Sequence, residues 1–182
     1  MVILRPTRKL HALLPPAAVS GQSDTALGDW YVNRLVVDRQ PLLLLVSAAS
    51  LLPILLPARD VRELPTRLAA IVATRLLRAG IEIEAVACER QAMEPVAIAP
   101  TVDRSVLGTM VDFAKAVPYY LEPGHWTRES LTLAEDRLAE TPCRTSQRAE
   151  RVIFPDQKAP ELLRARWLAA RVTLPTSKIV VH

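Results

Sequence analysis

Apolar residues of this chain fall into blocks separated by turn-forming residues, and their spacing predicts strands first and helices later. From Asp29 to Pro57 the sequence is dominated by Val and Leu, which are typical of strands. The pattern predicts three antiparallel strands, at Trp30 to Val37, Leu42 to Val46 and Leu51 to Leu56. The last should lie at a sheet edge, because Pro53 has no amide hydrogen to donate. Shorter strands are predicted at Val2 to Arg5 and at 95–99.

Helical spacing of apolar residues appears from residue 65 onward. One helix is predicted from Pro65 to Ala79, ended by Gly80. Its buried stripe would comprise Leu68, Ile71, Val72, Leu76 and Ala79, and its outer face Arg67, Arg75 and Arg78. Residues 81–94 fit either a helix or a strand. A helix that Pro118 ends follows at 104–117, the next spans Thr127 to Glu140 with Leu131, Ala134 and Leu138 inward, and the last begins at Pro160, burying Leu163, Trp167 and Ala170.

These elements predict an α+β fold in which an antiparallel meander sheet packs against several helices. Residues 1–121 should form a single α+β domain, and residues 122–182 a helical, basic C-terminal extension packed on or beside it. The competing interpretation of Leu42 to Leu56 as a membrane helix is disfavoured, since the stretch is short and contains two serines and a proline.

The helix after Pro100 carries an unusual polar stripe. Val106, Met110, Phe113 and Val117 repeat at helical spacing, whereas the opposite side is polar and includes a glycine. Because glycine destabilises a helix by about 1 kcal/mol relative to alanine, Gly108 predicts a close approach by a backbone, a side chain or a ligand. Asp103 is expected to be the N-cap. The polar candidates for ligand binding or for packing against the sheet are Asp103, Arg104, Ser105, Thr109 and Asp112.

A second candidate group stands at the start of the meander, where strand alternation places Trp30 and Arg34 on one face and Asn33 on the other. A buried Asn33 would need a hydrogen-bond partner, and the polar stripe of the Gly108 helix could supply it, which would make the two regions one site. The alternative is an exposed asparagine on a solvated strand.

Charge is distributed unevenly. The chain has a net charge of +4, and residues 144–182 hold eight Lys or Arg against three Asp or Glu, so this segment is +5 and the remainder −1. A basic segment can contact nucleic acid or an acidic partner, or it can be a solvated surface. The candidate contacts are Arg144, Arg148, Arg151, Lys158, Arg164, Arg166 and Arg171.

Most enzyme signatures are missing from the sequence. The five glycines are too scattered to form a phosphate-binding loop, the histidines and cysteines lack metal-ligand spacing, and no serine lies in a nucleophile elbow. We therefore expect no cofactor and no metal. One weak pattern is Asp156 and Lys158, which with Glu140 or Glu150 could form a metal-dependent nuclease site. A turn before the Pro160 helix explains that pattern better.

Several segments together resemble a known family. They are residues 4–10, the Trp30-Tyr31-Val32-Asn33 strand, the hairpin at 36–43 and the helix at 103–113. The chain resembles an uncharacterised bacterial family known only as a domain of unknown function, with a Trp-x-x-Asn strand, a basic hairpin and an (Asn/Asp)-Arg-Ser-x-Leu-Gly-x-Met-x-Asp-Phe helix. The match spans roughly residues 2–121 and departs at Val111, where a polar residue is expected. The resemblance implies a shared fold and a shared polar helix face.

The absence of catalytic motifs favours a non-enzymatic binding or regulatory module that recognises a protein or nucleic-acid partner. Homo-oligomerisation and a structural subunit of a two-gene module are the related alternatives. An enzyme acting on a small polar or phosphorylated substrate is the alternative from another class. The two widely separated cysteines and the lack of an apolar leader after Met1 predict a cytoplasmic protein with free thiols and no membrane association.

Overall fold

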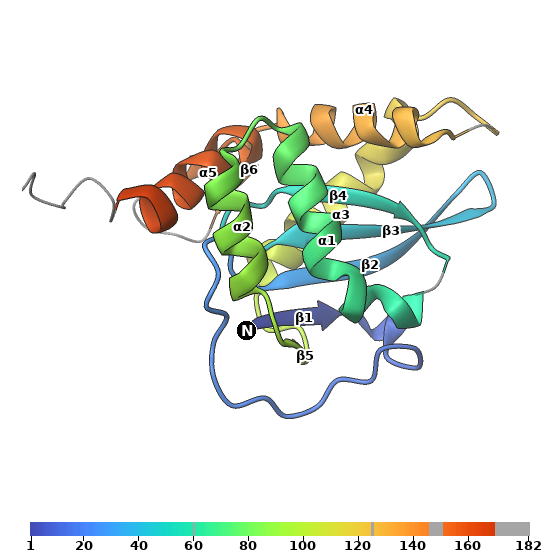
Figure 1. Ribbon diagram of the computed structural model, residues 1–182. Coiled ribbons are helices and arrows are strands. Elements are labelled where there is room, and N and C mark those ends of the chain that lie inside the picture. Colours follow the sequence, from blue (N-terminus) through green and yellow to red (C-terminus); the bar gives the residue numbers. More distant parts are fainter. Residues whose placement is uncertain (60, 125, 146–150, 170–182) are drawn as a thin grey trace, which may run out of the picture.

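The computed structural model describes residues 1–59, 61–124, 126–145 and 151–169 and has an α+β fold built on a five-stranded mixed sheet (Figure 1). The strand order is β4-β3-β2-β1-β5. The strands are β1 (Val2–Pro6), β2 (Trp30–Val37), β3 (Gln40–Ser47), β4 (Pro53–Pro57) and β5 (Val96–Ile98). The predicted meander is confirmed as β2, β3 and β4, which pair antiparallel. β1 pairs parallel with both β2 and β5, so the sheet is largely, but not purely, antiparallel.

The β2–β3 hairpin follows from its turn. Asp38 and Arg39 have φ angles of +47° and +65°, so this two-residue connection is left-handed at both positions. Such turns match the natural twist of paired strands. β3 therefore begins at Gln40, two residues before the predicted start, while Leu51 is not in a strand and lies in the β3–β4 connection with φ +59°.

Helices cover both faces of the sheet (Figure 1). On one face, α1 (Leu64–Arg78) and α2 (Ile83–Ala92) pack on a core that contains Trp30, Val32 and Leu68. On the other, α3 (Arg104–Tyr120) and α4 (Arg128–Ala139) pack on a second core that contains Tyr31 and Phe113. Alternation along β2 sends neighbouring side chains to opposite cores, as predicted.

The described part of the C-terminal extension joins both cores. α4 lies along β4, and its inward residues Leu131, Ala134 and Leu138 are buried as predicted. A short hairpin of β6 (Cys143–Arg144) and β7 (Val152–Ile153) follows. It is succeeded by α5 (Pro155–Leu163) and a π-helical turn at Arg164–Leu168. The division at residue 121 stays a prediction.

Three predicted helix details are wrong. α3 continues to Tyr120, because Pro118 lies in its last turn, where the missing amide hydrogen removes only the one helical hydrogen bond to the carbonyl of Ala114. The last helix begins at Pro155, since proline at the first helical position is preformed for the helix, and Pro160 lies inside it. Ala79 is exposed, and Gly80 follows it with a φ of +74° as the helix ends.

Short connecting elements complete the chain: 3-10 turns at Arg8–Leu10 and Val61–Glu63 lie within the segments that join β1 to β2 and β4 to α1. Within the described residues, no helix has the length and apolar character needed to cross a membrane. The Leu42 to Leu56 stretch, for which a membrane helix was considered, forms β3 and β4 instead.

Candidate functional site

β4 is an edge strand whose outer side offers no free amide hydrogen, because of its two prolines and of one carboxylate from α4. The amide of Ala58 donates to the carbonyl of Pro41 on β3, at 3.0 Å. Because successive residues of a strand direct their backbone hydrogen-bonding groups to opposite sides, those of residues 53, 55 and 57 point away from β3. Positions 53 and 57 are prolines, which have no amide hydrogen. The remaining amide, that of Leu55, donates to Oε1 of Glu135 at 2.7 Å. No backbone donor of β4 is left free for another strand.

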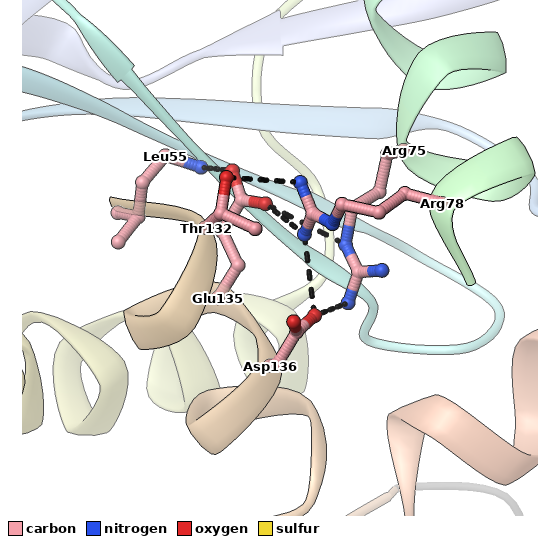
Figure 2. A network of polar contacts seen from close by, with 6 residues as sticks. All are labelled: Leu55, Arg75, Arg78, Thr132, Glu135 and Asp136. Carbon is pink, nitrogen blue, oxygen red and sulfur yellow. Dashed lines mark hydrogen bonds and ion pairs between the residues drawn. The ribbon is translucent and has the colours of Figure 1, made fainter. Parts of the chain in front are cut away.

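Glu135 also faces two arginines of α1 (Figure 2). Arg78 donates to Glu135 Oε2 and, through Nη1, to Oγ1 of Thr132 at 3.4 Å. Arg75 is 4% exposed, with its Nη2 atom 3.1 Å from Asp136 Oδ1 and its Nε atom 3.7 Å from Glu135 Oε2. Its Nε has no hydrogen-bond partner among the described residues. The network ties α1 and α4 together over the edge of β4.

Burial and charge act against each other in this network. Burial raises the pKa of Glu135, while the Leu55 amide and the two arginines act to lower it. Burial lowers the pKa of Arg75, and the nearby positive charge of Arg78 adds to that effect. For Arg78, the hydrogen bonds and charges of Glu135 and Asp136 outweigh burial, so its pKa is raised. Each buried charge is thus compensated by an opposite charge or by a hydrogen bond.

The same elements enclose a cleft of about 560 Å³ between α1, α4 and the β3–β4 side of the sheet. Its volume lies in the range of small-molecule sites. Apolar residues of β4, α1 and the start of α4 form much of its lining, including Ile54, Leu56, Ile71, Trp126 and Leu131. Six arginines also line it, namely Arg39, Arg59, Arg67, Arg75, Arg78 and Arg128.

Positive charge predominates in the lining of this cleft. Glu135 is the one acidic residue found among the described residues that line it. Within the described part of the chain, Arg39, Arg59, Arg67 and Arg128 form no ion pair. Since guanidinium groups remain protonated and match oxyanions in geometry, the cleft is suited to a negatively charged group.

A second cavity, of about 410 Å³, contains part of the predicted polar stripe of α3. Ser105, Gly108, Thr109 and Asp112 line it together with Arg144, which the sequence assigned to a different candidate group. The predicted close approach of a backbone or a side chain to Gly108 is wrong, because a Cβ placed there would meet nothing within 4 Å. The approach of a ligand stays a prediction. Gly108 borders open space in the cavity.

Other residues of that helix have local structural roles. Asp103 is the N-cap as predicted, and its carboxylate accepts from the amides of Ser105 and Val106, at 2.7 and 3.4 Å. Thr109 Oγ1 donates to the carbonyl of Ser105 at 3.3 Å. Arg104 is exposed and does not line the cavity. The thiol of Cys143 does line it, and burial together with the charge of Asp112 raises its pKa to about 11, which disfavours a reactive thiolate.

The strand group does not join the polar stripe. Asn33 is half-buried and accepts a hydrogen bond from Thr7 Oγ1 at 2.8 Å, so its oxygen is bonded to Thr7 and not to the Gly108 helix. Trp30 lies fully buried in the opposite core, and Arg34 is exposed. The strand meets α3 through Tyr31 instead, whose hydroxyl accepts from the Asp103 amide at 3.0 Å. Burial raises the pKa of that hydroxyl.

Several predicted C-terminal contacts are paired within the chain. Lys158 pairs with Glu161 at 2.8 Å, Arg164 with Glu82 at 2.7 Å, and Arg166 with Asp24. The hydrogen bond from Arg164 lowers the pKa of Glu82. Arg144 and Arg151 are exposed. Arg148 and Arg171 lie outside the described residues. These intramolecular ion pairs reduce the positive charge that this segment offers to a partner. In the cleft, by contrast, four arginines form no ion pair with another described residue.

The predicted turn at Asp156 and Lys158 is wrong, since both residues lie in the first turns of α5. Glu140 is engaged with Arg137 at 3.3 Å, and Glu150 lies outside the described residues. In the part of the chain that the structure describes, no group of three His, Cys, Asp or Glu side chains could hold a metal ion. The nuclease hypothesis gains no support from this arrangement.

Comparison with known families supports the resemblance. A model of the domain of unknown function DUF6933 matches residues 3–158. The chain belongs to this family. The match extends beyond the resemblance at 2–121 and includes α4, the β6–β7 hairpin and the start of α5, so the DUF6933 domain contains Glu135 and the whole lining of the cleft. No curated protein and no solved structure matches the chain.

For this member of DUF6933, sequence reasoning missed part of the cleft. Arg39, Arg59, Trp126, Arg128 and Glu135 were not candidates. Arg67, Arg75 and Arg78 were predicted on the outer face of α1, but Arg75 is buried and meets Glu135 and Asp136 of α4. A usable signal existed for Glu135, which stands four residues after Leu131 and therefore on the inward stripe of α4.

Proposed function

We propose that this protein is a binding module that takes up a ligand or partner through an anionic group, in the arginine-lined cleft between α1, α4 and β4. The observation that carries the proposal is the set of four cleft arginines, Arg39, Arg59, Arg67 and Arg128, that form no ion pair within the described residues. Surface arginines that converge on a concave lining raise the local concentration of anions. The proposed role is binding without catalysis.

The cytoplasm is the compartment that fits this proposal. Cys88 and Cys143 are both free thiols, as the reducing cytoplasm maintains them. A soluble anionic metabolite or an anionic segment of another cytoplasmic protein would then be within reach.

Inorganic pyrophosphate is the simplest probe of the cleft. At ten times its dissociation constant, it should stabilise the protein by about 1.4 kcal/mol, which raises Tm by about 3–6 °C for a chain of this size. Differential scanning fluorimetry at constant ionic strength measures this shift. The Arg67→Gln variant should lose most of it, because the substitution removes one cleft charge at an exposed helix position.

The matched control is Arg90→Gln. Arg90 is an exposed arginine on α2 that does not line the cleft, so this variant should respond as the wild type does. Equal losses in both variants, or no shift beyond that caused by sodium chloride of the same ionic strength, would refute the proposal.

A further inference from the structure

The cleft has two chemically different parts. The arginines supply positive charge, whereas the half-buried side chains of Leu56, Ile71 and Trp126 supply apolar surface beside them. A small inorganic anion would use the first part and leave the second in contact with water. Covering that apolar surface contributes binding free energy in proportion to the area removed from water.

The closed edge of β4 limits what can enter. A peptide that binds a sheet edge does so through backbone hydrogen bonds. β4 offers no free amide for this, because two of its outward residues are prolines and the amide of the third, Leu55, already donates to Glu135. An occupant that accepts hydrogen bonds, as an oxyanion does, must therefore take them from side chains and not from the backbone of β4.

From this geometry we infer that the cleft binds a free organic oxyanion, with a phosphate or carboxylate head group at the arginines and an aliphatic or aromatic body against the apolar lining. The volume of about 560 Å³ accommodates such a molecule and is far larger than one phosphate group needs. This inference rests on the proposed function and assigns the ligand class to the same cleft.

Alkyl phosphates test the two parts of the cleft separately. Isothermal titration calorimetry would compare inorganic phosphate, ethyl phosphate and octyl phosphate, all below micelle-forming concentrations. One buried methylene group changes affinity by about fourfold. We expect octyl phosphate to bind at least about tenfold more tightly than ethyl phosphate, which requires burial of only two of the six additional methylenes. Quenching of Trp126 fluorescence, absent in Trp126→Phe, would report occupancy of the cleft.

A substitution that fills the apolar part provides the decisive variant. Ala70 is exposed on α1 and lines the cleft, so Ala70→Phe should occupy space there without disturbing either core. It should lower the affinity for octyl phosphate at least about fivefold and leave the affinity for inorganic phosphate unchanged. Ala87→Phe, at an exposed position of α2 away from the cleft, is the matched control and should bind as the wild type does.

The outcomes separate the two proposals. Binding of octyl and ethyl phosphate with equal affinity, or equal effects of Ala70→Phe and Ala87→Phe, would overturn the assignment of an organic oxyanion and leave the proposed function intact. Failure of every phosphate to bind would overturn both. Co-sedimentation with phosphatidylcholine vesicles that contain phosphatidic acid, but no binding of octyl phosphate, would overturn the assignment to a free ligand.

Discussion

Replacing Glu135 tests how the edge of β4 and the α1–α4 contact are held. In Glu135→Leu, the Leu55 amide loses its acceptor and the 4%-exposed Arg75 loses one of its two carboxylate neighbours. Breaking a buried ion pair by removing one partner costs about 3–5 kcal/mol. In Glu135→Gln, the side-chain oxygen still accepts from Leu55, but the NH2 group that replaces Oε2 cannot accept from Arg78. Arg78 is 32% exposed and can bond to water instead, so the cost should be about 1–2 kcal/mol.

Urea unfolding followed by circular dichroism measures both free energies of unfolding. In thermal unfolding, the same costs correspond to about 6–20 °C for Glu135→Leu and about 2–8 °C for Glu135→Gln. Asp136→Asn is the control, because the Asp136 side chain is 45% exposed and its pairs with the arginines should contribute about 1 kcal/mol or less. If Glu135→Leu were no less stable than Glu135→Gln, the amide cap on β4 would not contribute and the reasoning would be wrong.

The same substitution should separate stability from binding. Glu135 is the carboxylate that lines the cleft, so Glu135→Gln removes one negative charge from the surroundings of a bound anion. The affinity for inorganic pyrophosphate should therefore rise while the free energy of unfolding falls. A fall in both would show that the cleft depends on the geometry of Glu135 more than on its charge.

Three further outcomes are expected. Gly108→Ala should stabilise the protein by about 0.5–1 kcal/mol, because a Cβ there meets nothing within 4 Å and alanine favours a helix; destabilisation in urea would show a contact at this position. Burial raises the pKa of Glu89, so its carboxyl group holds a proton more tightly in the folded state than in the unfolded chain. The contribution of Glu89 to stability therefore falls as pH rises from 4.5 through the folded pKa. The stability of the wild type relative to Glu89→Gln should decrease over this interval, and a constant difference would contradict it. In Cys88→Ser, Cys143 is the remaining cysteine, and its pKa of about 11 leaves about one thiol in a thousand ionised at pH 8. It should therefore react slowly with Ellman's reagent until urea unfolds the chain. Fast labelling of the folded protein would contradict burial of this thiol.

The central part of the sheet could be predicted because its information is local. β2, β3 and β4 are adjacent in sequence, consist of strand-forming residues and are joined by short connections. The flanking strands were also predicted, at Val2 to Arg5 and at 95–99, but their place in the sheet was not. β1 lies between β2 and β5 and is parallel to both, and β5 pairs with residues more than ninety positions earlier in the chain. The local spacing of so short a strand does not indicate which distant strand it pairs with.

Helix boundaries failed where a proline was taken as the end of a helix, as at Pro118, or as its start, as at Pro160. Pro118 is tolerated in the last turn of α3, and Pro155 and Pro160 both lie within α5. The missing amide hydrogen matters least near a helix start, where the first amides have no helical acceptor. For α1, α3 and α4, apolar spacing located the helix, whereas for α2 it left helix and strand open.

The candidate site illustrates the limit of single-sequence reasoning most clearly. Charged residues stand on the inward stripes of three helices: Arg75 in α1, Glu89 in α2 and Glu135 in α4. A buried charge needs a partner, so this cation and these two anions must each be paired or hydrogen-bonded inside the protein. Their positions in the sequence do not determine which anion meets the arginine. The topology decides it: α4 lies along β4 beside α1, which brings Glu135 to Arg75, whereas Glu89 accepts from the backbone amides of Ala26 and Leu27, at 2.8 and 3.0 Å. The same arrangement of α1 and α4 that buries Arg75 also brings Arg67 of α1 and Arg128 of α4 to one cleft beside β4.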